Sequence, residues 1–73
     1  MEPEDKNWCE VLVNLNGRIV EMQTKVSAQA VRVMDALERR HDIEAEEARF
    51  QALNEELRAL RSARDALLKE LAA

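Results

Sequence analysis

Apolar residues in this chain follow two heptad patterns, and the two patterns are out of phase with each other around residues 39–42. Continuing the first pattern past this point would place Arg40, Glu47 and Asn54 in an apolar core, where unpaired polar groups are costly. The face that can pack against another helix therefore changes near the middle of the chain. We interpret this break as a turn over residues 40–42 between two helices folded back on each other.

The local sequence around the break also favours a helix boundary. Arg39, Arg40 and His41 suit the C-terminus of a helix, where the helix dipole attracts positive charge. Asp42 is a suitable N-cap, and Glu44 follows in the first turn of a second helix, where acidic residues are favoured. Neither Gly nor Pro occurs at this point, so a continuous helix with a local phase slip also satisfies the pattern.

The first half of the chain predicts a long helix over about residues 8–40, preceded by a disordered lead-in over residues 1–7. Its apolar side chains recur at spacings of three and four residues, which places them on one face of a helix. Gln29 interrupts this seam. The seam begins at Trp8 and continues through Leu12, Leu15, Ile19, Met22, Val26, Val33 and Leu37.

Residues 9–23 also fit an N-terminal β-hairpin that would precede two helices. Apolar residues alternate from Val11 to Leu15, and Asn16-Gly17 is a strong signal for a two-residue hairpin turn. The helical interpretation instead places Gly17 inside a helix, at a cost of roughly 1 kcal/mol relative to Ala. We favour the helix, because its run of seam positions outweighs that cost.

The second half predicts a helix over about residues 43–71. Its apolar stripe is narrow and rich in Leu, which is typical of helix-on-helix packing. Arg64 occupies a seam position and is the exception to the pattern. The seam residues are Ile43, Phe50, Leu53, Leu57, Leu60, Leu67 and Leu71.

Together the two patterns predict an all-α fold, an antiparallel helical hairpin that forms one domain over residues 8–73. A single core of this size rarely contributes more than ~3–5 kcal/mol without disulfides, metal or oligomerisation. Cys9 is the only cysteine, and the first helix carries apolar residues that lie off its seam. We therefore expect the hairpin to dimerise into a four-helix bundle or coiled coil, with the two seams contributing to self-association. The off-seam apolar residues are Val11, Val13, Val20, Val31 and Met34.

Seven residues are candidates for binding a partner protein. A Trp at the end of a bundle can anchor a partner, although Trp8 also fits a structural role beside Leu71. Arg64 can select a register from its seam position, or extend its charged end to solvent. The candidates are Trp8, Val13, Val20, Val31, Arg58, Arg61 and Arg64.

The residue types needed for catalysis or metal binding are sparse. Cys9 and His41 would lie at opposite ends of the first helix, ~48 Å apart. Glu38 and His41 form a single Glu-x-x-His fragment, whereas helical metal sites repeat this motif on facing helices. The single Gly excludes most loops that cradle phosphates. We expect no enzymatic activity, no metal and no cofactor.

The charge pattern favours a soluble cytoplasmic protein. The net charge is −4 with both signs mixed along the chain, and no apolar run approaches the ~20 residues of a membrane span. We predict a small homodimeric helical-hairpin module that binds another protein, as an adaptor or as an inhibitor covering a functional surface. The alternatives are a structural coiled-coil assembly fragment and a nucleic-acid-associated regulator that reads its target with a β-hairpin at residues 9–23.

Overall fold

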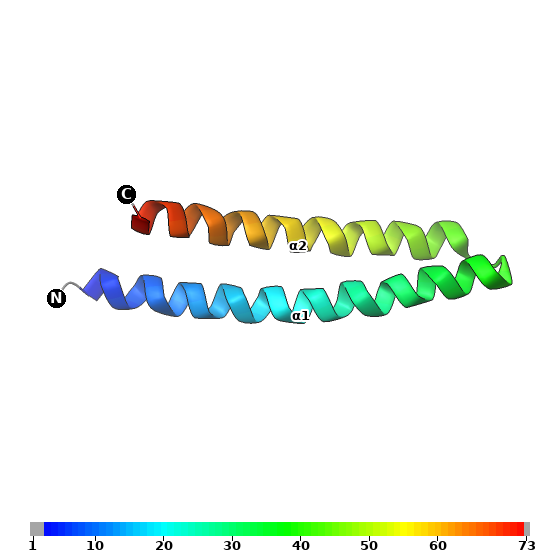
Figure 1. The fold of residues 1–73 in the computed structure, drawn as a ribbon, viewed down its shortest axis with the longest axis horizontal. Helices are drawn as coiled ribbons and strands as arrows, with labels where there is room; N and C mark the ends of the chain where they lie inside the picture. Colours follow the sequence, from blue (N-terminus) through cyan, green and yellow to red (C-terminus); the bar gives the residue numbers. More distant parts are fainter. Residues whose placement is uncertain (1–2, 73) are drawn as a thin grey trace.

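The computed structural model describes residues 3–72, which form two α-helices lying antiparallel and side by side (Figure 1). Helix α1 spans Pro3–Arg39 and helix α2 spans Ile43–Ala72. The molecule measures 58 × 17 × 14 Å, so its length is that of one long helix and its thickness that of a single helix layer. The predicted all-α helical hairpin is confirmed, and the chain reverses direction at the phase break.

Helix α1 is continuous through residues 9–23, so the alternative β-hairpin is wrong. The seam spacing of three and four residues extends on both sides of Gly17, and packing along that seam outweighs the weak helix propensity of one glycine. Helix α1 also begins earlier than predicted, at Pro3, a residue whose fixed φ angle suits the first helical position. Of the predicted disordered lead-in, residues 3–7 are helical, and residues 1 and 2 lie outside the described residues.

The turn between the helices uses a left-handed backbone conformation without glycine. Arg40 follows the last residue of α1 with a φ of 55°, and the His41 N–H donates to the Ala36 carbonyl at 3.1 Å. This bond is the outer hydrogen bond of a Schellman motif, a helix ending that usually has Gly at the left-handed position. The turn therefore ends α1 with standard hydrogen bonding but with an uncommon residue.

Asp42 occupies the position immediately before α2, as predicted for an N-cap. Its carbonyl accepts the first hydrogen bond of α2, from the Glu46 N–H at 3.0 Å. Its φ of 57° differs from the extended conformation typical of N-caps, and its carboxylate lies 2.8 Å from His41 Nδ1. Asp42 thus begins α2 through its backbone, while its side chain pairs with that of the preceding residue, His41.

A hydrogen-bonded pair of side chains, Gln29 and Glu46, shows which levels of the two helices face each other. Two residues are at the same level when they lie at the same height along the hairpin axis. Counting along both helices from this pair, through successive seam positions, gives the apolar residues of α1 and α2 that share a level. Ile19 and Leu57 fall at the same level, and they are the most buried large side chains, 2% and 4% exposed. The remaining levels are Met22 with Leu53, Leu15 with Leu60, Val26 with Phe50, Val33 with Ile43 and Trp8 with Leu67.

Two predicted seam residues lie at the margins of the interface. Leu37 is 54% exposed, whereas its neighbour Ala36 is 6% exposed, because the strict heptad from Gln29 arrives at Ala36. The prediction of Leu37 as a seam residue is therefore wrong within the hairpin. Leu71 is 41% exposed, because the register carries it past the level of Trp8.

We predict that Gly17→Ala stabilises the hairpin by up to about 1 kcal/mol, because alanine has the higher helix propensity. A Cβ at Gly17 would have no heavy atom within 4 Å, so the added methyl meets no clash. Urea unfolding followed by circular dichroism at two chain concentrations checks this value and separates any contribution from self-association. Ala28→Gly, at an exposed position of the same helix, is the matched control and should destabilise by a similar amount.

We also predict that Arg40→Gly stabilises the hairpin by about 0.5–1 kcal/mol, because glycine adopts a positive φ angle without a Cβ clash. The control is Glu38→Gly, two residues earlier and inside α1, where glycine should destabilise by about 1 kcal/mol. Thermal and urea unfolding of both variants measure the difference. Equal destabilisation by the two substitutions would show that Arg40 is not in the left-handed conformation.

Candidate interaction surface

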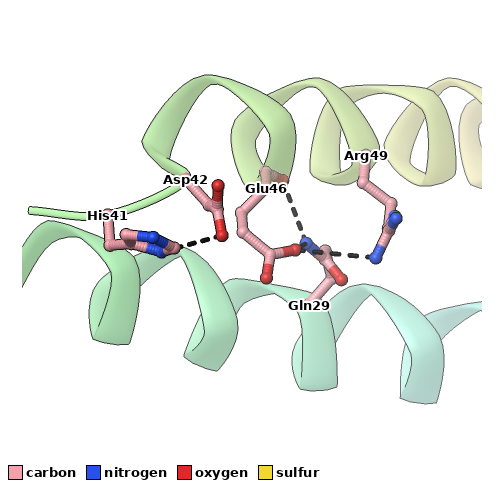
Figure 2. Close-up of polar contacts among 5 residues, drawn as sticks. All are labelled: Gln29, His41, Asp42, Glu46 and Arg49. Atoms are coloured by element: carbon pink, nitrogen blue, oxygen red, sulfur yellow. Dashed lines mark hydrogen bonds and ion pairs between the residues drawn. The ribbon is translucent and has the colours of Figure 1, made fainter. Parts of the chain in front are cut away.

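The most buried polar side chain belongs to Gln29, which is 5% exposed within the seam (Figure 2). Its Nε2 donates to the Glu46 backbone carbonyl at 2.9 Å and to Glu46 Oε1 at 2.8 Å. Arg49 Nη1 lies 3.7 Å from the same carboxylate oxygen. Among the described side chains, no buried nitrogen or oxygen atom lacks a hydrogen-bond partner. The polar break that the sequence shows at Gln29 is therefore matched by a partner on α2.

This amide–carboxylate pair suits a structural role. It offers no nucleophile, and its buried amide nitrogen donates to both the backbone carbonyl and the carboxylate of Glu46. A buried polar pair of this kind is formed in only one register, because sliding either helix by a heptad would bury one group opposite an apolar side chain. We infer that Gln29 and Glu46 select the register of the hairpin.

The candidate reactive residues remain apart. Cys9 is exposed near the start of α1, and His41 lies in the turn at the other end of that helix, paired with Asp42. Both side chains of the His41–Asp42 pair are mostly exposed, at 76% and 66%. Among the side chains described, those of residues 7–72, no three His, Cys, Asp or Glu gather as a potential metal site.

An apolar stripe is exposed to solvent on the face of α1 that points away from α2. Its members follow each other at alternating spacings of four and three residues, as the seam does, but on the opposite side of the helix. Val13, Val31 and Met34 are 65%, 65% and 64% exposed, and Val20 is 52% exposed. We call this surface the outer stripe, formed by Val13, Gly17, Val20, Thr24, Ser27, Val31 and Met34.

The polar members of the outer stripe are small and carry no charge. The Thr24 hydroxyl donates to the Val20 carbonyl at 3.2 Å, within its own helix, which satisfies the donor and leaves the methyl group available for contacts. Gly17 and Ser27 leave low points between the larger side chains. The stripe is therefore an uneven but uncharged surface over about six turns of helix.

Over residues 11–37 the charges of α1 lie on one flank of this stripe, and Glu10 and Glu38 continue the line of the stripe at its two ends. Between residues 11 and 37 all charged side chains fall within an arc of about 100° at 100° per residue. The other flank, between the outer stripe and the seam, is uncharged and contains Asn16, Gln23, Ala30 and Leu37. The charged residues are Arg18, Glu21, Lys25, Arg32 and Asp35.

The structure brings only some of the predicted partner-binding residues together. Val13, Val20 and Val31 share the outer stripe, whereas Trp8 is partly buried in the seam at the open end of the hairpin. Arg58 and Arg61 are exposed on α2, far from that stripe. Arg64 is partly buried at its seam position, with Nε and Nη2 each 3.3 Å from Asp65 Oδ1. The seven candidates therefore form no single site.

Sequence reasoning missed two features that a longer count of heptads would have found. Extending the series Leu53, Leu60 and Leu67 back by one step reaches Glu46, the partner of Gln29. Extending the spacing from Val13 and Val20 includes Gly17, Thr24 and Ser27, which turns isolated valines into a continuous surface.

Neither helix, over the described residues, combines the length and apolar character required to cross a membrane. Comparison of the chain with protein families, with curated proteins and with solved structures finds no match. Function is therefore inferred from the surfaces of the hairpin itself.

We predict that Gln29→Ala and Glu46→Ala are coupled in a double-mutant cycle, with an interaction free energy of about 0.5–1.5 kcal/mol. Gln29→Ala removes both hydrogen bonds donated by Nε2, whereas Glu46→Ala removes the bond to Oε1 and keeps the bond to the backbone carbonyl. Urea unfolding of the four proteins gives the coupling. Gln23→Ala and Glu47→Ala, at exposed positions, form the control cycle and should show no coupling.

Proposed function

We propose that this chain is a self-associating helical-hairpin module, in which the outer stripe of α1 binds a second copy and the dimer binds another protein. The observation that carries the proposal is a set of exposed apolar side chains aligned on one uncharged face, Val13, Val20, Val31 and Met34. Single exposed apolar residues are ordinary, but an aligned and uncharged series over several turns is typical of an interface.

The total surface of the hairpin supports this proposal. The accessible surface is 5919 Å² for a chain of 8.4 kDa. A compact monomer of this mass exposes about 4,600 Å², so the hairpin exposes about 1,300 Å² more than expected. A standard interface covers about 800 Å² on each partner. Covering the outer stripe would bring the exposed surface toward the range of compact proteins.

The limited core gives a second reason for association. Among the described residues, Ile19, Ala36 and Leu57 are the apolar side chains that are fully buried. Two helices share one line of contact, so most seam residues remain partly exposed. A second copy would add a further apolar interface without a disulfide or metal, as expected for a chain of this size.

Binding, rather than catalysis, fits the chemistry of the side chains. Cys9 and His41 are separated by most of the length of α1, and the buried Gln29 amide nitrogen donates to Glu46 within the hairpin. In the proposed dimer the two α2 helices lie on the outside, with Arg58 and Arg61 interspersed among acidic residues. That mixed surface suits contact with a folded protein better than the dense basic surface that binds nucleic acid. An adaptor or an inhibitor that covers a partner's surface would use it in this way.

We predict that the wild-type chain sediments at twice its monomer mass of 8.4 kDa, and that Val20→Glu/Val31→Glu sediments as a helical monomer. The two carboxylates would be placed in the centre of the apolar contact, where burial of an unpaired charge is costly. Sedimentation equilibrium measures the mass, and circular dichroism checks that the hairpin remains helical.

The matched control is Gln51→Glu/Ser62→Glu, which adds two acidic residues at the same spacing to an exposed face of α2. This variant should remain dimeric. A wild-type protein that is monomeric throughout the micromolar range would contradict the proposal. Dimerisation that survives in Val20→Glu/Val31→Glu and is lost in the control would place the interface on α2 instead.

A further inference from the structure

The outer stripe has a pattern of sizes that favours one orientation of the second copy. Resting on the dimer proposed above, we infer that two α1 helices pack antiparallel along this stripe, with Gly17 of each copy level with Met34 of the other. The occupant of the stripe is thus the same stripe of a second chain, related by a two-fold axis. Side-chain size, the placement of charge and the exposure of Leu37 all favour this arrangement.

Side-chain size is complementary in this antiparallel register. Placing Gly17 level with Met34 of the second copy also places Val20 level with Val31 and Thr24 level with Ser27. The largest side chain of the stripe then faces the position without a side chain, where a Cβ would meet no atom within 4 Å in the hairpin. The chosen register places Val13, at the end of the stripe, level with Glu38 of the second copy. Shifting the register by one heptad would place Gly17 level with Ser27, two small residues, and would place Met34, the largest side chain, level with Glu10.

The charged flank of α1 is complementary to itself in the same register. Antiparallel helices place each flank beside the equivalent flank of the partner, so the charged flanks meet. Glu21 then lies within about 3 Å along the axis of the level of Arg32 of the second copy, a distance that long side chains span. Asp35 likewise lies within about 3 Å along the axis of the level of Arg18 of the second copy. Each acid on the flank therefore has a base of the other copy within about 3 Å of its level along the axis. The remaining base, Lys25, lies near Lys25 of the second copy beside the two-fold axis, so four ion pairs accompany one contact between like charges.

The uncharged flanks also meet in the antiparallel arrangement. Leu37 of each copy would lie within about 3 Å along the axis of the level of Asn16 of the other, and Gln23 would bear the same relation to Ala30. This contact would cover Leu37, which is 54% exposed and lies outside the seam in the hairpin. Parallel helices would instead place the charged flank of one copy beside the uncharged flank of the other, which offers no ion pair and leaves Leu37 facing a charged surface.

Charge reversal tests the register. Glu21→Arg and Arg32→Glu, made singly, should each weaken dimerisation about 3- to 10-fold at low salt, because two symmetric pairs become repulsive. The double variant should recover wild-type affinity, since both pairs are restored with opposite polarity. Within one chain these positions lie 11 residues apart, too far to pair directly, so recovery reports on contact between copies. Sedimentation at low and high salt measures the dissociation constants.

Spin labels distinguish the orientation independently of affinity. In a Cys9→Ser background, a label at Lys25→Cys would lie close to the two-fold axis, whereas labels at Arg39→Cys would lie about 40 Å apart along the axis. A parallel dimer would give short distances at both positions and overturn the inference while leaving the dimer proposal intact. Failure of the double charge variant to recover, in a chain that dimerises, would also overturn it. A monomeric wild type would instead contradict the proposed function.

Discussion

One line of apolar contact between α1 and α2 is the constraint on which the rest of this fold depends. Two helices alone can bury one stripe each, so every level of the seam contributes to a narrow interface and few side chains are fully enclosed. Ile19 and Leu57 lie at the same level near the middle of that line and are the most buried large residues. A hairpin built in this way is held by the length of its seam rather than by a central core.

The polar pair within the seam gives the hairpin its specificity. A heptad repeat alone permits the helices to slide by seven residues with little change in apolar contact. Gln29 and Glu46 remove this freedom, because their hydrogen bonds form in one register and would leave buried groups unpaired in the others. Polar atoms in a thin interface reduce the stability of the hairpin. In return, the two helices have a single defined alignment.

Much of the fold could be predicted from the sequence because the heptad pattern is long and its phase changes once. The phase change located the turn at residues 40–42, and the predicted seam residues other than Leu37 and Leu71 are buried or half-buried within the hairpin. Leu37 was misplaced because the interruption at Gln29 obscured which of two neighbouring residues continues the repeat. The β-hairpin alternative arose from local turn chemistry at Asn16-Gly17, which helix packing overrides. The outer stripe was recognised only in part, because Gly17, Thr24 and Ser27 are not apolar enough to be noticed without the geometry.

The turn has a further consequence for how the hairpin is maintained. Arg40 and Asp42 both hold positive φ angles, each at a cost of about 1–2 kcal/mol that a straightened helix would not incur. A straightened chain could form the same seam with a neighbouring molecule, which is the geometry of helix exchange between copies. The closed form is maintained because the two halves of one chain meet at a higher effective concentration than two separate chains do. A high concentration of chains therefore favours the straightened form, in which the turn residues lose their positive φ angles, although no residue of the turn belongs to an interface.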